Sequence, residues 1–176
     1  SKKSACGLAR AYLAQGKPEK AKQILDPIIS IALVESAKET STKDGYDKKP
    51  SSNKEVSAGG EYIETTKIEQ DTFSADLKSL YGIALYNLNN ILDAEPWLIA
   101  ALNEDPSRTD LLVPIAHAAM QKRDYASAWK NLESASKIAS KDRTWLILKS
   151  QYALENSRQT DAERFARTAV SYYPQD

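Results

Sequence analysis

Residues with reactive side chains are few and widely separated in this chain. His117 is the only histidine and Cys6 the only cysteine among 176 residues. Zinc-type sites and nucleophile–base pairs need several such groups at close spacing, so neither can be assembled from this sequence. The carboxylates Asp93 and Glu95 are neighbours in sequence, but a spacing of two residues places them on different sides of a helix. The chain also has no glycine-rich phosphate loop and no G-x-S-x-G elbow. We therefore expect no enzyme activity, no bound metal and no cofactor.

The charge balance limits the classes of partner. Lys plus Arg equals Asp plus Glu at 24 each, so the net charge is zero and no global field attracts nucleic acid or anionic lipid. Hydrophobic residues make up 41% and charged residues 27%, as in a folded soluble protein. No apolar run approaches the ~20 residues that a membrane helix needs, so we expect no direct membrane insertion. We expect a soluble protein; an intracellular location is favoured over the bacterial periplasm or a larger anchored protein. The chain begins with Ser1 rather than Met, which suggests a fragment or a processed product.

A 34-residue period organises most of the chain and predicts stacked helix pairs. Three columns of small residues follow this spacing: Ala94, Ala128 and Ala162; Ala101, Ala135 and Ala169; Gly82, Ala116 and Ser150. Antiparallel helices that cross at 8–10 Å need small residues where their ridges meet, which explains why these columns stay small. A plain helical bundle would give no reason for a repeat at a fixed spacing.

These residues resemble the motif of the tetratricopeptide repeat family. The resemblance covers residues 75–176 as three tandem copies, and a further copy near the N-terminus reads LARAYLAQGKPEKAKQIL. Two positions depart from the family pattern, Lys149 in a slot that is usually apolar and Ser157 in a turn that often has Gly. The resemblance implies an all-α fold, namely an α-solenoid of 34-residue helix–turn–helix repeats forming a right-handed superhelix.

The repeat pattern divides the chain into three parts. Residues 1–38 form a first helix pair, 39–72 an inserted flexible loop, and 73–176 three repeats with boundaries at 107–108 and 141–142. Eight helices are expected, at about 3–15, 18–37, 73–88, 91–104, 109–122, 124–139, 143–156 and 158–172. Pro27 should kink or divide the second of these. The insertion is rich in Ser, Lys, Asp and Gly, which favours a tolerated loop over a partner-binding segment.

The family resemblance also implies a concave groove lined by the outward stripe of each first helix. Carried onto this sequence, the groove residues are Arg10, Asp76, Ile83, Tyr86, Asn87, Asp110, Val113, His117, Met120, Gln121, Ile147, Gln151 and Glu155. Leu154 belongs to the same stripe in the last copy. Each of these residues could instead be an ordinary core residue, and Tyr86, Met120 and Leu154 are evenly balanced between the two interpretations. We expect the carboxylates of the stripe to favour a partner segment of mixed apolar and basic character.

The leading functional hypothesis is a scaffold that binds a peptide or helix of another protein in this groove, without nucleic acid. The alternative is a structural subunit of a larger assembly, because the last helix carries apolar residues with no sequence left to cover them. These candidate end contacts are Phe165, Ala169, Tyr172 and Tyr173. Repeat arrays usually end in a polar capping helix, so this end predicts either a homo-oligomer or further repeats beyond Asp176.

Overall fold

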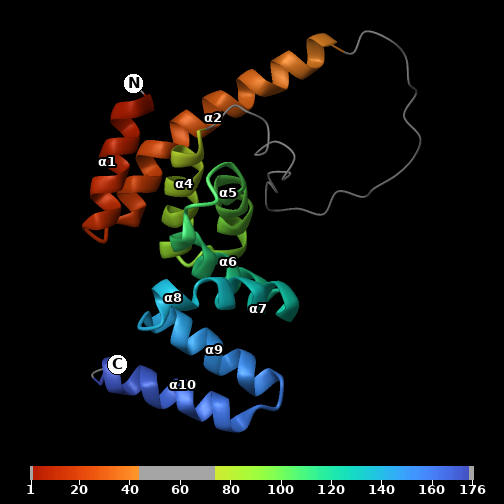
Figure 1. Ribbon diagram of the computed structural model, residues 1–176. Coiled ribbons are helices and arrows are strands. Elements are labelled where there is room, and N and C mark those ends of the chain that lie inside the picture. The colour runs from red at the N-terminus through yellow and green to blue at the C-terminus, as the bar shows by residue number, and fades with distance from the viewer. Residues whose placement is uncertain (1, 44–73, 175–176) are drawn as a thin grey trace.

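The computed structural model describes residues 2–43 and 74–174, with side chains through residue 31 in the first range. Within these ranges the chain is helical and contains no strand. The elements are α1 (Lys2–Ala14), α2 (Pro18–Lys43), α4 (Ala75–Asn87), α5 (Ile91–Glu104), the short 3-10 helix η1 (Thr109–Leu111), α6 (Leu112–Gln121), α7 (Tyr125–Ser134), α8 (Ser136–Ala139), α9 (Arg143–Glu155) and α10 (Gln159–Tyr172). Consecutive helices pack as antiparallel pairs, and the pairs follow one another from α1 at one end of the molecule to α10 at the other (Figure 1). No helix in the described ranges is long and apolar enough to cross a membrane.

The same tight turn joins the two helices of every pair. Gly16, Asn89, Arg123 and Ser157 all have left-handed backbones, with φ between 58° and 67°. In each turn the next residue's N–H returns to a carbonyl five residues before it, for example from Arg158 to Ala153 at 2.8 Å. This is the Schellman motif, which satisfies the last carbonyls of a helix and reverses the chain. The last three of these turns recur at the spacing of the alanine columns.

Small residues lie where the helices of a pair cross, as the period predicts. Ala94 and Ala128 have no exposed surface and Ala162 is almost fully buried. A Cβ added to Gly82 would lie 2.7 Å from Cδ2 of Leu98, so a larger residue where α4 crosses α5 would force the Leu98 side chain to move. Larger side chains fill the space beside these crossings and form two apolar clusters, one centred on α2, α4 and α5 and the other on α6, α7 and α9.

Two helices differ from the sequence-based expectations. α2 continues to Lys43 rather than ending near 37, and Pro27 lies inside it without dividing it. The first residues of the predicted 39–72 insertion thus belong to α2, and the part from residue 44 onward lies outside the described residues. The single helix expected at 124–139 is interrupted at Ala135, between α7 and α8. There the hydroxyl of Ser134 donates to the carbonyl of Lys130 at 2.8 Å, a side-chain bond that competes with the helical pattern and bends helices.

Candidate partner-binding surface

The two side chains with reactive potential, His117 and Cys6, are far apart and occupied by local contacts. Nδ1 of His117 lies 3.0 Å from the hydroxyl of Tyr86, and burial lowers the pKa of the imidazole. Burial raises the pKa of the Cys6 thiol, and the carboxylate of Asp76 adds to this effect, so the thiol stays protonated and weakly nucleophilic. Within the described residues no three His, Cys, Asp or Glu side chains gather into a metal-binding group.

Ion pairs occupy the N-terminal part of the predicted stripe. Arg10 of α1 reaches across to Asp76 of α4, with 2.5 Å between Nη2 and Oδ1. Arg108 binds Asp110 through two parallel bonds of 2.9 Å, and its remaining nitrogen donates to Ser79 at 3.0 Å. The guanidinium of Arg108 holds the pKa of Asp110 below its usual range. Two of the three carboxylates expected to attract a basic partner, Asp76 and Asp110, are therefore already paired with arginines of this chain, whereas Glu155 is exposed.

In the middle of the stripe, Tyr86 of α4 interacts with residues of the next two helix pairs. Its ring packs edge-on against that of His117, with centroids 5.8 Å apart, and its hydroxyl bonds to the same imidazole. Burial raises the pKa of Tyr86; the Asp142 carboxylate adds to the rise, whereas the Thr144 hydroxyl opposes it. Asp142 and Thr144 belong to the start of α9, two pairs away from α4. The predicted groove residues Tyr86 and His117 are thus half-buried and in contact with each other.

The remaining members of the predicted stripe range from buried to exposed. Val113 is buried, and Ile83 and Met120 are half-buried against the two apolar clusters. The exposed members are Asn87, Gln121, Ile147, Gln151 and Glu155. The apolar part of the stripe that reaches solvent is therefore concentrated on α9.

On α9, two large aliphatic side chains are exposed on the same side of the helix. Ile147 is 40% exposed and Leu154, which follows it by two turns, is 58% exposed. A spacing of seven residues places both on one face of the helix, with Gln151 between them. This face could contact an apolar segment of a partner.

The four predicted end-contact residues fall into two groups. Phe165 packs edge-on against Trp145, with centroids 5.8 Å apart, and Ala169 lies against the same cluster. The hydroxyl of Tyr173 donates to the carbonyl of Lys141 at 2.8 Å, whereas Tyr172 is largely exposed. Phe165 and Ala169 thus hold α10 onto its own neighbours.

A groove of about 280 Å³ runs between α9 and α10. Its lining includes Ile147 and Gln151 from the predicted stripe and Ala169 and Tyr173 from the predicted end contacts. Val170, which is 64% exposed, completes its apolar side. The two sets of candidate residues, predicted for different functions, therefore meet at one surface.

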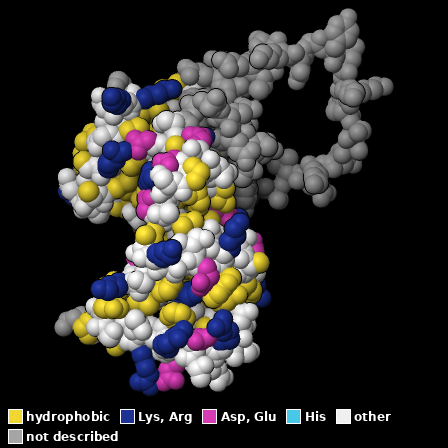
Figure 2. Space-filling model, in the orientation of Figure 1, with side chains coloured by type: hydrophobic (Ala, Val, Ile, Leu, Met, Phe, Trp, Pro, Cys, Tyr) yellow, Lys and Arg dark blue, Asp and Glu magenta, His cyan; other side chains and the backbone are white. Residues whose placement is uncertain are grey.

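Charged side chains are mixed in sign over the visible face of the molecule. Lys and Arg alternate with Asp and Glu over both halves of the described part of this face, with apolar patches between them (Figure 2). This distribution agrees with the zero net charge of the chain.

Comparison with known proteins identifies the fold. No family model matches the sequence, and no curated protein resembles it closely enough to count as a relative. A solved structure titled "Crystal structure of MamA protein" superposes on 98% of this chain and 73% of its own, with a TM-score of 0.56 and 12% sequence identity. The fold is of the tetratricopeptide type. At this identity the likeness establishes the helical-repeat architecture and nothing about partners.

Several residues that shape this tetratricopeptide-type surface were absent from the predicted stripe. Arg108 pairs with Asp110 only two residues away, a spacing that carries no periodic signal. Ala166 and Ser150 line the groove between α9 and α10. The 34-residue period could have predicted that these two residues lie at a packing surface. Ala166 follows Leu132 by 34 residues and Ser150 follows Ala116 by 34, and both earlier residues are buried.

Proposed function

We propose that this chain is a protein–protein interaction scaffold that holds a peptide or helix of a partner on the side of the array formed by its first helices. The observation that supports this most is the pair of exposed aliphatic side chains, Ile147 and Leu154, on one face of α9. Large apolar side chains exposed on one face of a helix suit contact with a partner, because binding energy at an interface concentrates in a few large side chains.

The rest of the stripe plays a supporting role in this proposal. Tyr86 and His117 are half-buried in the middle of the stripe, and the Tyr86 hydroxyl bonds to the imidazole of His117. The arginine pairs neutralise Asp76 and Asp110, so the partner segment is mainly apolar where it meets α9 and needs no strong positive charge. The stripe can therefore bind a segment whose apolar side chains lie along one face, as in an amphipathic helix.

Site-specific photo-crosslinking tests this proposal. A photoreactive amino acid at position 154 should trap a defined protein in an extract of the organism that makes this chain. The matched control is position 92, because Leu92 is an exposed aliphatic residue on a second helix, α5, outside the stripe. Equal trapping at both positions, or trapping at 92 alone, would place the contact outside the stripe and overturn the proposal.

A second candidate function, self-association in a larger assembly, is supported by a different observation. The groove between α9 and α10 is apolar and open, and Val170 within it lies outside the partner-binding stripe. The two candidates can be separated, because Leu154 belongs to the stripe alone and Val170 to the groove alone.

A further inference from the structure

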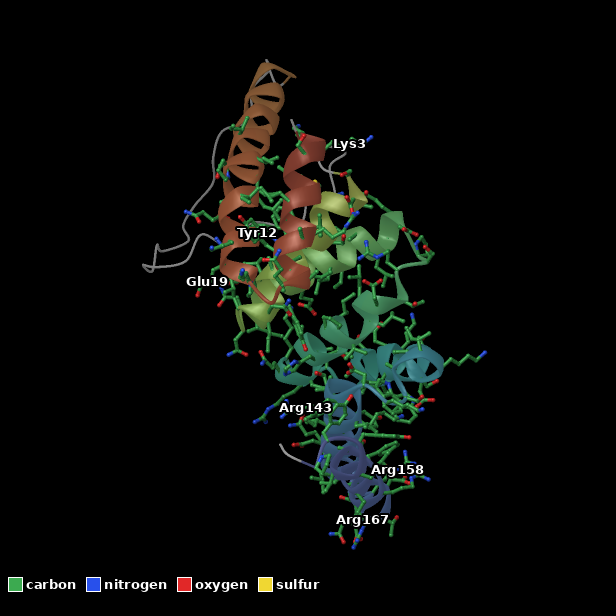
Figure 3. All side chains as sticks on the ribbon, turned by 90° about the vertical axis from the view of Figure 1, so that its left-hand side faces the viewer. Lys3, Tyr12, Glu19, Arg143, Arg158 and Arg167 are labelled. Atoms are coloured by element: carbon green, nitrogen blue, oxygen red, sulfur yellow. The ribbon has the colours of Figure 1, made fainter. Side chains whose placement is uncertain are left out.

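A cavity of about 300 Å³ lies between α7, α9 and α10 and shares no residue with the stripe or with the groove between α9 and α10. Arg143 lines that groove and Arg158 lines the cavity, and the two arginines lie on opposite sides of the molecule (Figure 3). The volume is at the lower end of the range found for small-molecule sites. The cavity is therefore a separate feature that could hold a ligand of one or two rings.

The cavity lies on a side of the array that a following helix pair leaves open. At the junction one pair earlier, Ile99 and Lys130 hold the positions that Glu133 and Arg164 hold here, each 34 residues before. The pair α9–α10 follows that junction, yet Ile99 is 38% exposed and Lys130 is also exposed. The opening of the cavity therefore does not depend on what precedes or follows the described helices.

The residues that make the cavity depart from those of the junction before it. Three of them are Trp129, Lys149 and Tyr152, and the residues 34 positions earlier are Glu95, Ile115 and Ala118. A glutamate is thus replaced by a tryptophan, an isoleucine by a lysine and an alanine by a tyrosine. Because repeats pack through equivalent positions, departures that gather around one cavity indicate a role beyond holding the helices together.

Aromatic side chains form the apolar walls of the cavity. The rings of Trp129 and Tyr152 stack with centroids 4.8 Å apart and planes at 25°. Both side chains are half-buried, and Trp145 and Phe165 line the cavity beside them. Flat walls of this kind suit a planar ring, which gains from stacked and edge contacts with aromatic side chains.

A buried ammonium supplies the cavity with positive charge. Lys149 is buried and lines the cavity, and its ammonium lies over the ring of Trp129. An ammonium has three donors, and Glu133 is the only hydrogen-bond acceptor that Lys149 meets among the described residues. Because the Glu133 side chain is 47% exposed, its carboxylate can give way to the carboxylate of a ligand.

Two arginines add positive charge at the edge of the cavity. Arg158 and Arg164 are exposed, and Nη2 of each binds the carboxylate of Asp161, at 2.5 and 3.1 Å respectively. Asp161 thus holds both guanidiniums beside the cavity, and each guanidinium keeps donors for a second carboxylate. Among the described residues that line the cavity, three cations face two carboxylates, so the site is positive overall.

We propose that this cavity binds a small planar aromatic carboxylate. The ring lies against Trp129 and Tyr152, and the carboxylate accepts charge-assisted hydrogen bonds from Lys149. An aromatic cation fits less well, because the Lys149 ammonium already lies over the Trp129 ring and repels a second positive charge. This inference goes beyond the scaffold proposal and depends neither on the stripe nor on self-association.

Equilibrium dialysis of this chain against two indole compounds of opposite charge tests the inference. Indole-3-acetate and tryptamine carry the same ring, but the first ends in a carboxylate and the second in an ammonium. The acid should bind with a dissociation constant below about 1 mM, and at least tenfold more tightly than the amine. Equal affinities for the two compounds, or no binding of the acid at that concentration, would overturn the inference.

Two changes inside the cavity examine the role of Lys149. Lys149→Met removes the buried cation and should weaken binding of indole-3-acetate at least tenfold; the position is apolar one repeat earlier, so circular dichroism should show unchanged helix content. Glu133→Gln should tighten binding about threefold, because the ammonium loses its competing carboxylate. A lysine that only holds the helices together gives no such gain, so unchanged affinity in both variants would reject the site.

A matched pair of exposed arginines on α10 provides the control. Arg164 and Arg167 each pair with a carboxylate, but Arg164 lines the cavity and Arg167 does not. Arg164→Gln should weaken binding of indole-3-acetate about two- to fivefold, the range of an exposed charge contact, whereas Arg167→Gln should leave it unchanged. Both changes remove one positive charge, so equal losses would mean that the acid responds to the net charge of the chain rather than to this cavity.

Discussion

Lys149 shows how a charged residue can occupy an apolar slot of the array. It is only 4% exposed, and its ammonium lies 3.9 Å from the ring centroid of Trp129 and 5.4 Å from those of Trp145 and Phe165. Glu133 of α7 completes the site with an ion pair. The sequence marked Lys149 as a departure from the repeat pattern, but three of its partners, Trp129, Glu133 and Phe165, could not be predicted because they come from other helices. Cation–π contacts and the carboxylate together offset part of the cost of burying this charge.

The ion pair between Lys149 and Glu133 can be tested by a double-mutant cycle. Glu133→Gln should lower the free energy of unfolding by about 1 kcal/mol, because it leaves the buried ammonium without a counter-charge. In a Lys149→Met background, where no buried charge remains, the same change should cost less than about 0.3 kcal/mol. Urea unfolding of the four proteins measures both costs. Equal costs in the two backgrounds would show that Glu133 acts independently of Lys149.

His117 should make stability depend on pH near neutrality. Burial lowers its pKa from the ordinary value of 6.5, so the folded state favours the neutral imidazole while the unfolded state protonates more readily. The contribution is present above pH 6.5 and is lost as the pH falls toward the lower, folded-state pKa. The unmodified chain should therefore lose more unfolding free energy than His117→Gln between about pH 7.5 and 5. Parallel curves for the two proteins over this interval would contradict the assignment.

At the scale of elements, the helices follow from the period and the turns from local backbone geometry. Most helices begin and end close to their predicted limits, because the repeat places them between turns that recur every 34 residues. The break at Ala135 could not be predicted in this way, since it depends on one hydroxyl of Ser134 rather than on the apolar pattern. The extent of α2 past residue 37 likewise has no signal in the 34-residue spacing.

Ser157 occupies a left-handed turn position that glycine would suit better. Its φ is 58°, and Gly16 holds the equivalent position in the first pair with φ 67°. Ser157→Gly should raise the free energy of unfolding by about 0.5–1 kcal/mol, because a side chain disfavours this conformation. The mirror change, Gly16→Ser, should lower it by a similar amount; a Cβ at Gly16 meets no atom within 4 Å, so only the backbone conformation is affected. Thermal unfolding of both variants compares them, and a loss of stability in Ser157→Gly would contradict this account.

At the scale of the whole molecule, stacked helix pairs bring distant residues onto common surfaces. The family resemblance placed Ile147 and Gln151 on an exposed side of α9, where the structure also has them. It could not show that Asp76 and Asp110 are paired with arginines, because Arg10 and Arg108 meet them only after folding. Nor could it show that Tyr86 lies between α6 and the start of α9. The stripe is therefore apolar and accessible mainly near its C-terminal end.

The central claim, that a partner binds along the exposed face of α9, can be tested most directly by an affinity measurement. The protein trapped at position 154 would be purified and its dissociation constant measured against the unmodified chain, Leu154→Asp and Leu92→Asp. Leu154→Asp should weaken binding at least tenfold, about 1.4 kcal/mol, because it would bury a carboxylate in an apolar contact. Leu92→Asp should leave the dissociation constant within twofold of that of the unmodified chain. Equal affinities for all three proteins, or a greater loss in Leu92→Asp, would contradict the claim.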